Sequence, residues 1–190
     1  MTKSELKMIF YLLQGRENVG KTFRQMASES GMSLGSVQQN FQQLAAAGYI
    51  LDTPKGKVLR RRSQLIDRWA RGYAEELKAR QLLQRFTFLT PQVRASWQQV
   101  SLPQGCHWSG EAAAILEGFI SPQRWDLYVP ESANALIATG RMIPDLDGEI
   151  FVHRRFWQTD DIPPLVVYAD LLATGDDRCA EAAERIKRLI

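Results

Sequence analysis

The stretch that decides the fold of the first part of the chain is TFRQMASESGMSLGSVQQNFQQLAAAGYI, residues 22–50. It predicts two helices, one over about residues 22–30 and one over about residues 34–47. Gly31, between them, supplies the backbone freedom that a tight turn needs. Ser33 stands where a side-chain oxygen can cap the free amides at the start of the second helix. A helical pair joined by a tight turn is therefore expected.

The second helix of this pair has two chemically distinct faces. Its apolar stripe contains Leu34, Val37, Phe41 and Leu44, and its polar stripe contains Ser36, Gln39, Asn40 and Gln43, flanked by Gln38 and Gln42. Glutamine and asparagine donate and accept hydrogen bonds without carrying charge, so they can read base edges in a DNA major groove, above all those of adenine. Glutamine is also a good helix former, so the stripe taken alone fits an ordinary solvated face equally well.

The sequence on either side extends this pair into a larger pattern. Upstream, the helical spacing of Leu6, Ile9, Phe10 and Leu13 predicts an amphipathic helix over residues 4–14. Downstream, Gly48 can end the second helix in a left-handed conformation, and residues 49–62 predict a hairpin that turns over residues 54–57. Basic side chains at the tip and end of this hairpin are suited to lie along a phosphate backbone: Lys55, Lys57, Arg60, Arg61 and Arg62.

Three helices and a hairpin in this order resemble the winged helix-turn-helix of bacterial regulators. The resemblance rests on MA (26–27), GMS (31–33), Val37, Phe41, Leu44 and GYI (48–50). It implies that the domain binds double-stranded operator DNA, with the third helix reading bases and the hairpin fixing its register. The DNA-binding residues predicted on this basis are Ser33, Ser36, Gln38, Gln39, Asn40, Gln43, Lys55, Lys57, Arg60 and Arg61.

Charge is unevenly distributed along the 190 residues. Residues 1–85 contain fifteen Lys and Arg against seven Asp and Glu, whereas residues 86–190 contain nine against fourteen. A basic excess on a small domain favours a polyanion through counterion release, and the acidic half would be repelled by the same duplex. The two halves are therefore expected to have different partners.

The composition also bounds the class of protein. Hydrophobic residues make up 45% of the chain, which is enough to close a core. Cys106 and Cys179 exclude a disulfide framework, and neither has a second cysteine or histidine at zinc-finger spacing. The N-terminus lacks the pattern of a signal peptide, and the longest apolar runs fall well short of the ~18 residues of a membrane span. We expect a globular cytoplasmic protein with no membrane contact, metal or cofactor.

One motif points elsewhere. GRENVGKT, residues 15–22, fits the pattern of a Walker A phosphate-binding loop, and the run from Leu165 to Asp170 can be mistaken for a Walker B strand. A Walker A loop follows a buried strand, however, and the residues before Gly15 have helical spacing. We therefore expect the glycines to bend a loop between two helices, with Lys21 facing phosphate or solvent.

The rest of the chain predicts an α+β fold, in which an N-terminal winged helix-turn-helix is joined by a helix to a C-terminal mixed α/β domain. The expected boundaries are residues 1–62, 63–84 and 85–190. The connecting helix has an apolar stripe that can pack on its own domain or pair with a second copy in a homodimer. In the last part, strands are expected over residues 86–89, 125–129, 149–154 and 166–168, and helices over residues 110–116 and 177–189.

This last part resembles the AbiEi-type antitoxin regulators. The motifs that carry the resemblance are WSGEAA (108–113), GFISP (118–122), LYV (127–129), FW (156–157) and PLVVYADLLATGDDR (164–178). The resemblance implies a winged helix that represses its own operon and a C-terminal domain that counters a nucleotidyltransferase-like toxin. Ser109 departs from the pattern, because the family is expected to have a glycine there.

The shared residues can be read as scaffold without any catalysis. Gly110 permits close packing, Phe156 and Trp157 suit a core, and Asp170 and Asp176 suit the capping of helices or loops. His107 and His153 lack a nucleophile or a metal-binding set around them, and a histidine of this kind is more often a hydrogen-bonded structural residue.

Two rival functions remain open at this point. One is a restriction-like, metal-dependent nuclease, because three carboxylates lie near predicted strand ends: Asp126, Glu149 and Asp170. Against it, no lysine stands two residues after Glu149. The other rival function is that of a protein-interaction adaptor whose winged helix has lost DNA binding. We favour a non-enzymatic DNA-binding autoregulator and antitoxin.

Overall fold

The computed structural model describes residues 1–116, 118 and 121–190. The chain divides into two compact units, Met1–Glu76 (unit 1) and Leu77–Ile190 (unit 2). The division falls inside the predicted connecting helix, which the sequence had placed between two domains. Both units combine helices and strands, which confirms the expected α+β class. The motif residues Phe119 and Ile120 lie outside the described residues.

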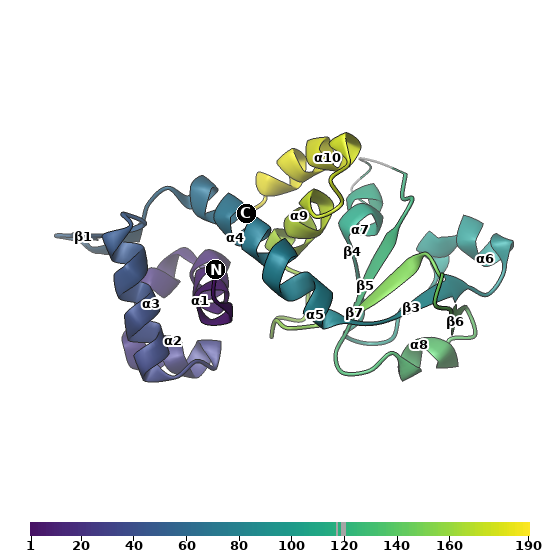
Figure 1. Ribbon diagram of the computed structural model, residues 1–190, viewed down its shortest axis with the longest axis horizontal. Helices are drawn as coiled ribbons and strands as arrows, with labels where there is room; N and C mark the ends of the chain where they lie inside the picture. The colour runs from purple at the N-terminus through teal and green to yellow at the C-terminus, as the bar shows by residue number, and fades with distance from the viewer. Residues whose placement is uncertain (117, 119–120) are drawn as a thin grey trace. The chain divides into compact units, whose positions relative to one another are not determined.

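Unit 1 begins with three helices and a hairpin (Figure 1). In order, its elements are α1 (Lys3–Gln14), the 3-10 helix η1 (Arg16–Gly20), α2 (Phe23–Ser30), α3 (Leu34–Ala46), β1 (Ile50–Thr53), β2 (Gly56–Leu59) and α4 (Arg62–Tyr73). Gly31 ends α2 in the left-handed conformation with a φ of 62°. Ser33 accepts a hydrogen bond from the amide of Ser36 and so caps α3. Both expectations for this turn are confirmed.

Helix α4 packs on α1 within unit 1. The indole nitrogen of Trp69 donates to the carbonyl of Leu6 at 3.0 Å, and both side chains are fully buried. The ring of Trp69 stacks on Tyr73 at a centroid distance of 5.0 Å, and Arg68 forms an ion pair with Glu5. The part of the predicted connecting helix that forms α4 is therefore covered by its own unit, whereas Leu82 and Leu83, at the end of the expected stripe, lie exposed in β3.

Unit 2 is built on a five-stranded sheet with the strand order β4-β5-β7-β3-β6, in which β5 and β7 run parallel and the other neighbours antiparallel. The elements around the boundary and up to β4 are the π-helix η2 (Ala74–Lys78), α5 (Ala79–Gln81), β3 (Leu82–Phe88), α6 (Pro91–Ala95), η3 (Trp97–Gln99) and β4 (His107–Ser109). The remaining elements are α7 (Gly110–Leu116), β5 (Trp125–Val129), α8 (Asn134–Ala138), β6 (Met142–Pro144), β7 (Ile150–Arg154), α9 (Pro164–Leu172) and α10 (Asp177–Lys187).

The two faces of this sheet differ in chemistry. One face carries an apolar core rich in tryptophan, where Phe88, Trp97 and Trp108 pack with Trp125 and its neighbours. Residues that alternate with these along the strands bond instead toward α9, for example Ser109, whose hydroxyl donates to Asp170 of that helix. Helices α7, α9 and α10 contact one another beside this second face (Figure 1). The second face is therefore polar and covered.

The predicted strand over residues 166–168 is wrong, because these residues lie in helix α9. A short apolar run with β-branched residues cannot be assigned to a strand or a buried helix by its periodicity. Every side chain from Leu165 to Leu171 is buried, so α9 shows no polar stripe that would reveal helical spacing. Of the other expected elements of unit 2, α7 and β5 form with the expected boundaries, and β3, β7 and α10 form with boundaries shifted by a few residues.

Candidate nucleic-acid interface

Helix α3 presents a row of glutamines to solvent. Gln38, Gln39, Gln42 and Gln43 are all exposed. Positions four residues apart on a helix are neighbours, so these four side chains form one patch two columns wide. Ser33 and Ser36 lie at the N-terminal end of the patch, where the hydroxyl of Ser33 donates to that of Ser36 at 2.9 Å. The patch offers exposed amide donors and acceptors, which are the kind of group that can read base edges.

Asn40 does not belong to this patch, and its predicted place on the polar stripe is wrong. Its side chain is 5% exposed. The amide nitrogen donates to the hydroxyl of Ser4 on α1 at 2.8 Å and to the carbonyl of Ser36 at 2.7 Å. Asn40 therefore joins α3 to α1. Leu34 departs in the opposite direction, because it is 40% exposed although the sequence placed it on the apolar stripe.

The hairpin turns more tightly than predicted. Thr53 pairs with Gly56, so only Pro54 and Lys55 form the turn, and Lys57 lies within β2. Lys55 is exposed at the tip. The ammonium of Lys57 instead lies 5.6 Å from the ring centre of Phe23 and 5.5 Å from that of Phe41. Such a position favours the cation electrostatically and ties Lys57 to the two helices.

The three arginines after the hairpin differ in exposure and in what they contact. Arg60 is exposed. Arg61 has a left-handed backbone with a φ of 50°, and its guanidinium lies beside Gly48 at the end of α3, where a positive charge is favourable. Arg62 is half-buried and donates to the carbonyl of Leu13 at 2.7 Å. Among the predicted phosphate contacts, Lys55, Lys57, Arg60 and Arg61 are all exposed, and Lys57 and Arg61 also lie against other parts of unit 1.

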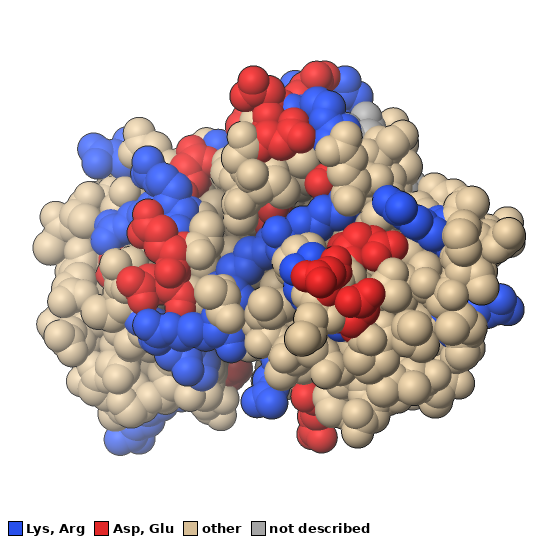
Figure 2. Space-filling view, turned by 45° about the vertical axis from the view of Figure 1, so that its right-hand side comes forward, with Lys and Arg blue, Asp and Glu red and all other residues tan. Residues whose placement is uncertain are grey.

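The two units differ in net charge. Unit 1 contains twelve Lys and Arg against seven Asp and Glu, and unit 2 contains twelve against fourteen. The face of the molecule in Figure 2 shows basic and acidic side chains interspersed. The basic excess that favours a polyanion therefore belongs to unit 1, and unit 2 is close to neutral.

The Walker A pattern at residues 15–22 has a structural role in unit 1. The residues before it form helix α1, whereas a phosphate-binding loop follows a strand. Lys21 forms an ion pair with Glu29 at 2.6 Å, and Thr22 caps α2 in a reciprocal arrangement with Gln25. The glycines bend the connection between α1 and α2, as expected.

Unit 2 contains a second candidate site, a cluster of charged side chains on the polar face of the sheet, all buried except the partly exposed Arg124. Its centre is the ammonium of Lys78, which lies 2.9 Å from Oδ1 of Asp170 on α9 and 3.4 Å from Oδ1 of Asp126 on β5. Asp126 also contacts Nε2 of His153 at 2.8 Å and accepts from Arg124 at 2.9 Å. We call Lys78, Arg124, Asp126, His153 and Asp170 the ion cluster.

Hydroxyl groups complete the surroundings of Asp170. Ser109 donates to its Oδ2 at 2.6 Å, and Tyr128 donates to the same oxygen at 3.0 Å. Ser109 is the residue that departs from the AbiEi-like sequence pattern, and its hydroxyl supplies this bond. At the start of α7, Gly110 has a φ of 54°, and a Cβ there would lie 3.0 Å from Oδ2 of Asp126. Gly110 therefore permits the close packing expected from the sequence.

The electrostatics of the ion cluster stabilise its charged form. Burial alone would raise the pKa of Asp126, but the charge of Lys78, the hydrogen bond of His153 and the charge of Arg124 outweigh it and lower this pKa. Burial likewise disfavours the charged form of Lys78, yet Asp170 and Asp126 raise its pKa. The acidic and basic groups of the cluster thus stabilise one another in their charged forms.

The ion cluster brings together two of the three carboxylates that suggested a nuclease. Glu149 lies apart from it, because its Oε2 accepts from Thr87 at 2.8 Å. Asp126 and Asp170 are 1% and 0% exposed, so a duplex cannot reach them. Within residues 1–116, 118 and 121–190, no three His, Cys, Asp or Glu side chains are grouped to hold a metal ion.

Sequence reasoning missed Lys78 and Arg124. The available signal was Asp126 and His153 in otherwise apolar strands, since a buried charge needs a partner. His153 has the hydrogen-bonded role expected of it, and Asp176 caps α10 by accepting from the amide of Arg178 at 2.8 Å. Asp170, in contrast, lies within α9 and caps no following helix.

Comparison with known proteins places this second unit in a family. A family model for transcriptional regulators that are AbiEi antitoxins of type IV toxin–antitoxin systems matches residues 57–190. The chain belongs to this AbiEi antitoxin family. The match covers all of unit 2 together with β2 and α4 of unit 1, apart from the first residue of β2, and leaves α1, α2 and α3 outside. Neither the curated proteins nor the solved structures gave a match.

The family assignment confirms the resemblance drawn from the motifs of residues 108–178. It makes the chain a member of a family of regulators and antitoxins rather than of a family of enzymes. No helix in the described part of the chain is both long enough and apolar enough to cross a bilayer.

Proposed function

We propose that this AbiEi-family chain is an operator-binding autoregulator whose unit 1 acts as a winged helix-turn-helix. The observation that carries the proposal is the exposed glutamine patch of α3, with the exposed cations Lys55 and Arg60 on the neighbouring hairpin. Uncharged amides distinguish bases, whereas cations contact every phosphate alike. Helix α3 would thus read sequence and the hairpin would hold it in register.

The test measures how removing one side-chain amide changes the affinity for two different duplexes. Full-length protein is titrated against a labelled duplex from upstream of its own gene and against a scrambled duplex, at one salt concentration. Replacing Gln39 with alanine should cost about 1–3 kcal/mol on the first duplex and little on the second. Gln64→Ala, an exposed glutamine on α4, is the matched control and should change neither affinity. Equal losses on both duplexes for Gln39→Ala would remove base reading from α3.

We further propose that unit 2 provides the antitoxin activity and counters a nucleotidyltransferase-like toxin without catalysis. The support is that the family match spans the whole of unit 2, and that the ion cluster is internally paired with both of its carboxylates buried. Co-expression with a nucleotidyltransferase-like protein from an adjacent gene should restore growth. Rescue should persist in Gln39→Ala, because that variant leaves unit 2 unchanged, and its loss would tie rescue to DNA binding instead.

A further inference from the structure

Helix α3 begins with two exposed residues, Leu34 and Gly35. Positions four residues apart on a helix are neighbours, so Leu34 precedes Gln38 in one column of the glutamine patch and Gly35 precedes Gln39 in the other. An apolar side chain and a bare stretch of backbone therefore continue the surface that the glutamines form.

The fold of unit 1 does not require a glycine at position 35. The backbone of Gly35 is helical rather than left-handed, a conformation that any residue can adopt. A Cβ added there would meet no atom of the described residues within 4 Å, the adjoining backbone aside. Glycine is also a poor helix former, so alanine at this position should favour the helix. The missing side chain instead leaves space outside the helix, where a ligand can come close to the backbone.

Leu34 adds an apolar group to the same end of the patch. Its side chain is 40% exposed. In the major groove of DNA, the apolar group that a side chain can contact is the C5-methyl of thymine, and the paired adenine presents N6 and N7 to an amide. A leucine and a glutamine in one column therefore match a sequence that contains A·T pairs.

The charges around this end of α3 match a duplex. Lys7 of α1 is exposed, and its ammonium donates to the carbonyl of Gly31 at 3.1 Å, in the turn that precedes α3. Lys55 and Arg60 are exposed on the hairpin. A second copy of unit 1 would bring the same cations and be repelled, whereas DNA brings phosphates that attract them.

We propose that Leu34 packs on the methyl group of a thymine in the operator and that Gly35 lets α3 come close to the same part of the groove. This contact rests on the DNA-reading role of α3 proposed above. It lies at the N-terminal end of the helix, where recognition helices contact base edges. It makes Leu34 a specificity-determining residue beside the glutamines.

The test removes one methyl group from the DNA at a time. Full-length protein is titrated against the duplex from upstream of its own gene, with single thymines replaced by deoxyuridine. At least one replacement should weaken wild-type binding about fourfold, the effect of uncovering one methyl group. The same replacement should change the affinity of Leu34→Ala by less than about twofold, because the partner of the methyl group is gone.

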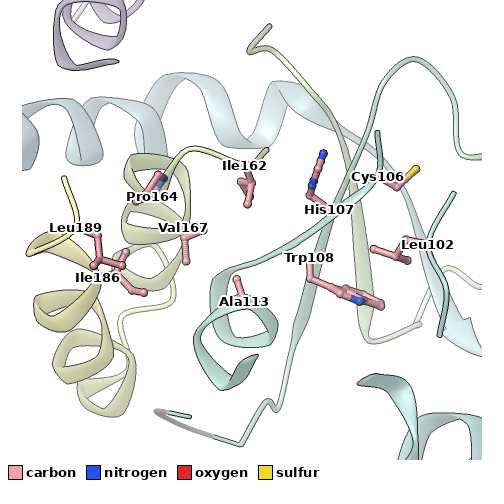
Figure 3. Close-up of a pocket in the computed structure, with 10 residues that line it drawn as sticks. All are labelled: Leu102, Cys106, His107, Trp108, Ala113, Ile162, Pro164, Val167, Ile186 and Leu189. Carbon is pink, nitrogen blue, oxygen red and sulfur yellow. The ribbon is translucent and has the colours of Figure 1, made fainter. Parts of the chain in front are cut away.

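An exposed leucine elsewhere provides the matched control for Leu34→Ala. Leu189 is 62% exposed and belongs to the wall of an apolar pocket in unit 2 (Figure 3). Leu189→Ala should bind as tightly as wild type and respond to the replacement in the same way. Thermal unfolding that matches wild type confirms that Leu34→Ala is folded.

Gly35→Ala tests the close approach separately. Its thermal unfolding should be unchanged or shifted upward, because alanine favours a helix. Its affinity for the upstream duplex should fall at least about fivefold, the effect of forcing an extra methyl group into a packed contact. Gly20→Ala, at a glycine outside α3 where an added Cβ likewise has free space, is the matched control and should bind as tightly as wild type.

The proposal is overturned if no deoxyuridine replacement weakens wild-type binding, if the weakening persists in Leu34→Ala, or if Gly35→Ala binds as tightly as wild type. Gln39→Ala distinguishes these results from a failure of the proposed function. A loss confined to the upstream duplex in that variant keeps base reading in α3, whereas equal losses on both duplexes remove base reading from the whole helix.

Discussion

Removing the lysine at the centre of the ion cluster should destabilise unit 2 strongly. In Lys78→Met the new side chain keeps most of the aliphatic volume but leaves Asp126 and Asp170 buried without the ammonium between them. Taking away one partner of a buried ion pair typically costs about 3–5 kcal/mol. Arg124 and His153 still contact Asp126, and two hydroxyls still donate to Asp170. We therefore expect the lower end of that range, about 3 kcal/mol.

The assay is urea unfolding followed by tryptophan fluorescence. Four of the five tryptophans, all but Trp69, lie in unit 2, so the signal reports mainly on that unit. Arg154→Met, at an exposed position at the end of β7, is the matched control and should stay within about 0.5 kcal/mol of wild type. The triple variant that adds Asp126→Asn and Asp170→Asn should recover part of the loss, because no buried carboxylate is then left unpaired.

The deficit of Lys78→Met should also depend on pH in a defined direction. The folded-state pKa of Asp126 is lowered, so its pairing stabilises the fold above the ordinary pKa of about 4 and loses this effect as the pH falls through the folded value. In Lys78→Met this pKa moves upward toward the ordinary value, so the variant has less stability to lose in acid and its deficit shrinks as the pH falls. Well below both values the two proteins should converge. A loss below about 1 kcal/mol at neutral pH, or a deficit that grows in acid, would refute this account of the ion cluster.

Three further predictions concern unit 1. Asn40→Ala should lower the stability of unit 1 by about 1–3 kcal/mol in thermal unfolding, because it leaves the partners of a buried amide unsatisfied; unchanged stability would show that the bonds to Ser4 and Ser36 are dispensable. Lys55→Ala should weaken binding to every duplex about equally and lower the log–log salt slope by roughly 0.9, whereas Lys57→Ala should lower it less; identical slopes for both variants would contradict the different positions of the two ammonium groups. Calorimetry with ATP or GTP and magnesium should show no binding, and a saturable isotherm abolished by Lys21→Ala would restore the Walker A interpretation.

The sequence was informative wherever a local rule acts on the backbone. Gly31 and Ser33 define the turn between α2 and α3 because few residues tolerate a left-handed backbone or cap a helix. The strand over residues 125–129 and the helix over residues 110–116 were predicted with their observed boundaries. These features depend on neighbours in the chain, so a single sequence contains what is needed to predict them.

Features that depend on distant partners could not be predicted in this way. Asn40 has the chemistry of a base-reading residue, and only the position of Ser4 on α1 shows that its amide is already occupied. Lys78 looks like one more charge in a solvated helix until Asp126 and Asp170 come together around it. Helix α9 was mistaken for a strand because a helix covered on all sides has no polar stripe.

The alternation along β5 has a consequence for how the sheet finds its pairing. All five residues from Trp125 to Val129 are buried, so the contrast between solvent and core cannot decide which way this strand faces. A slip of one residue against β7 would turn Asp126 into the tryptophan-rich core and place Leu127 against the ammonium of Lys78. Each of these misplacements buries an unpaired charge, which costs several kcal/mol. The charges of the ion cluster thus raise the free energy of misaligned sheets more than they lower that of the native sheet. As a result, β5 can pair with β7 in only one register.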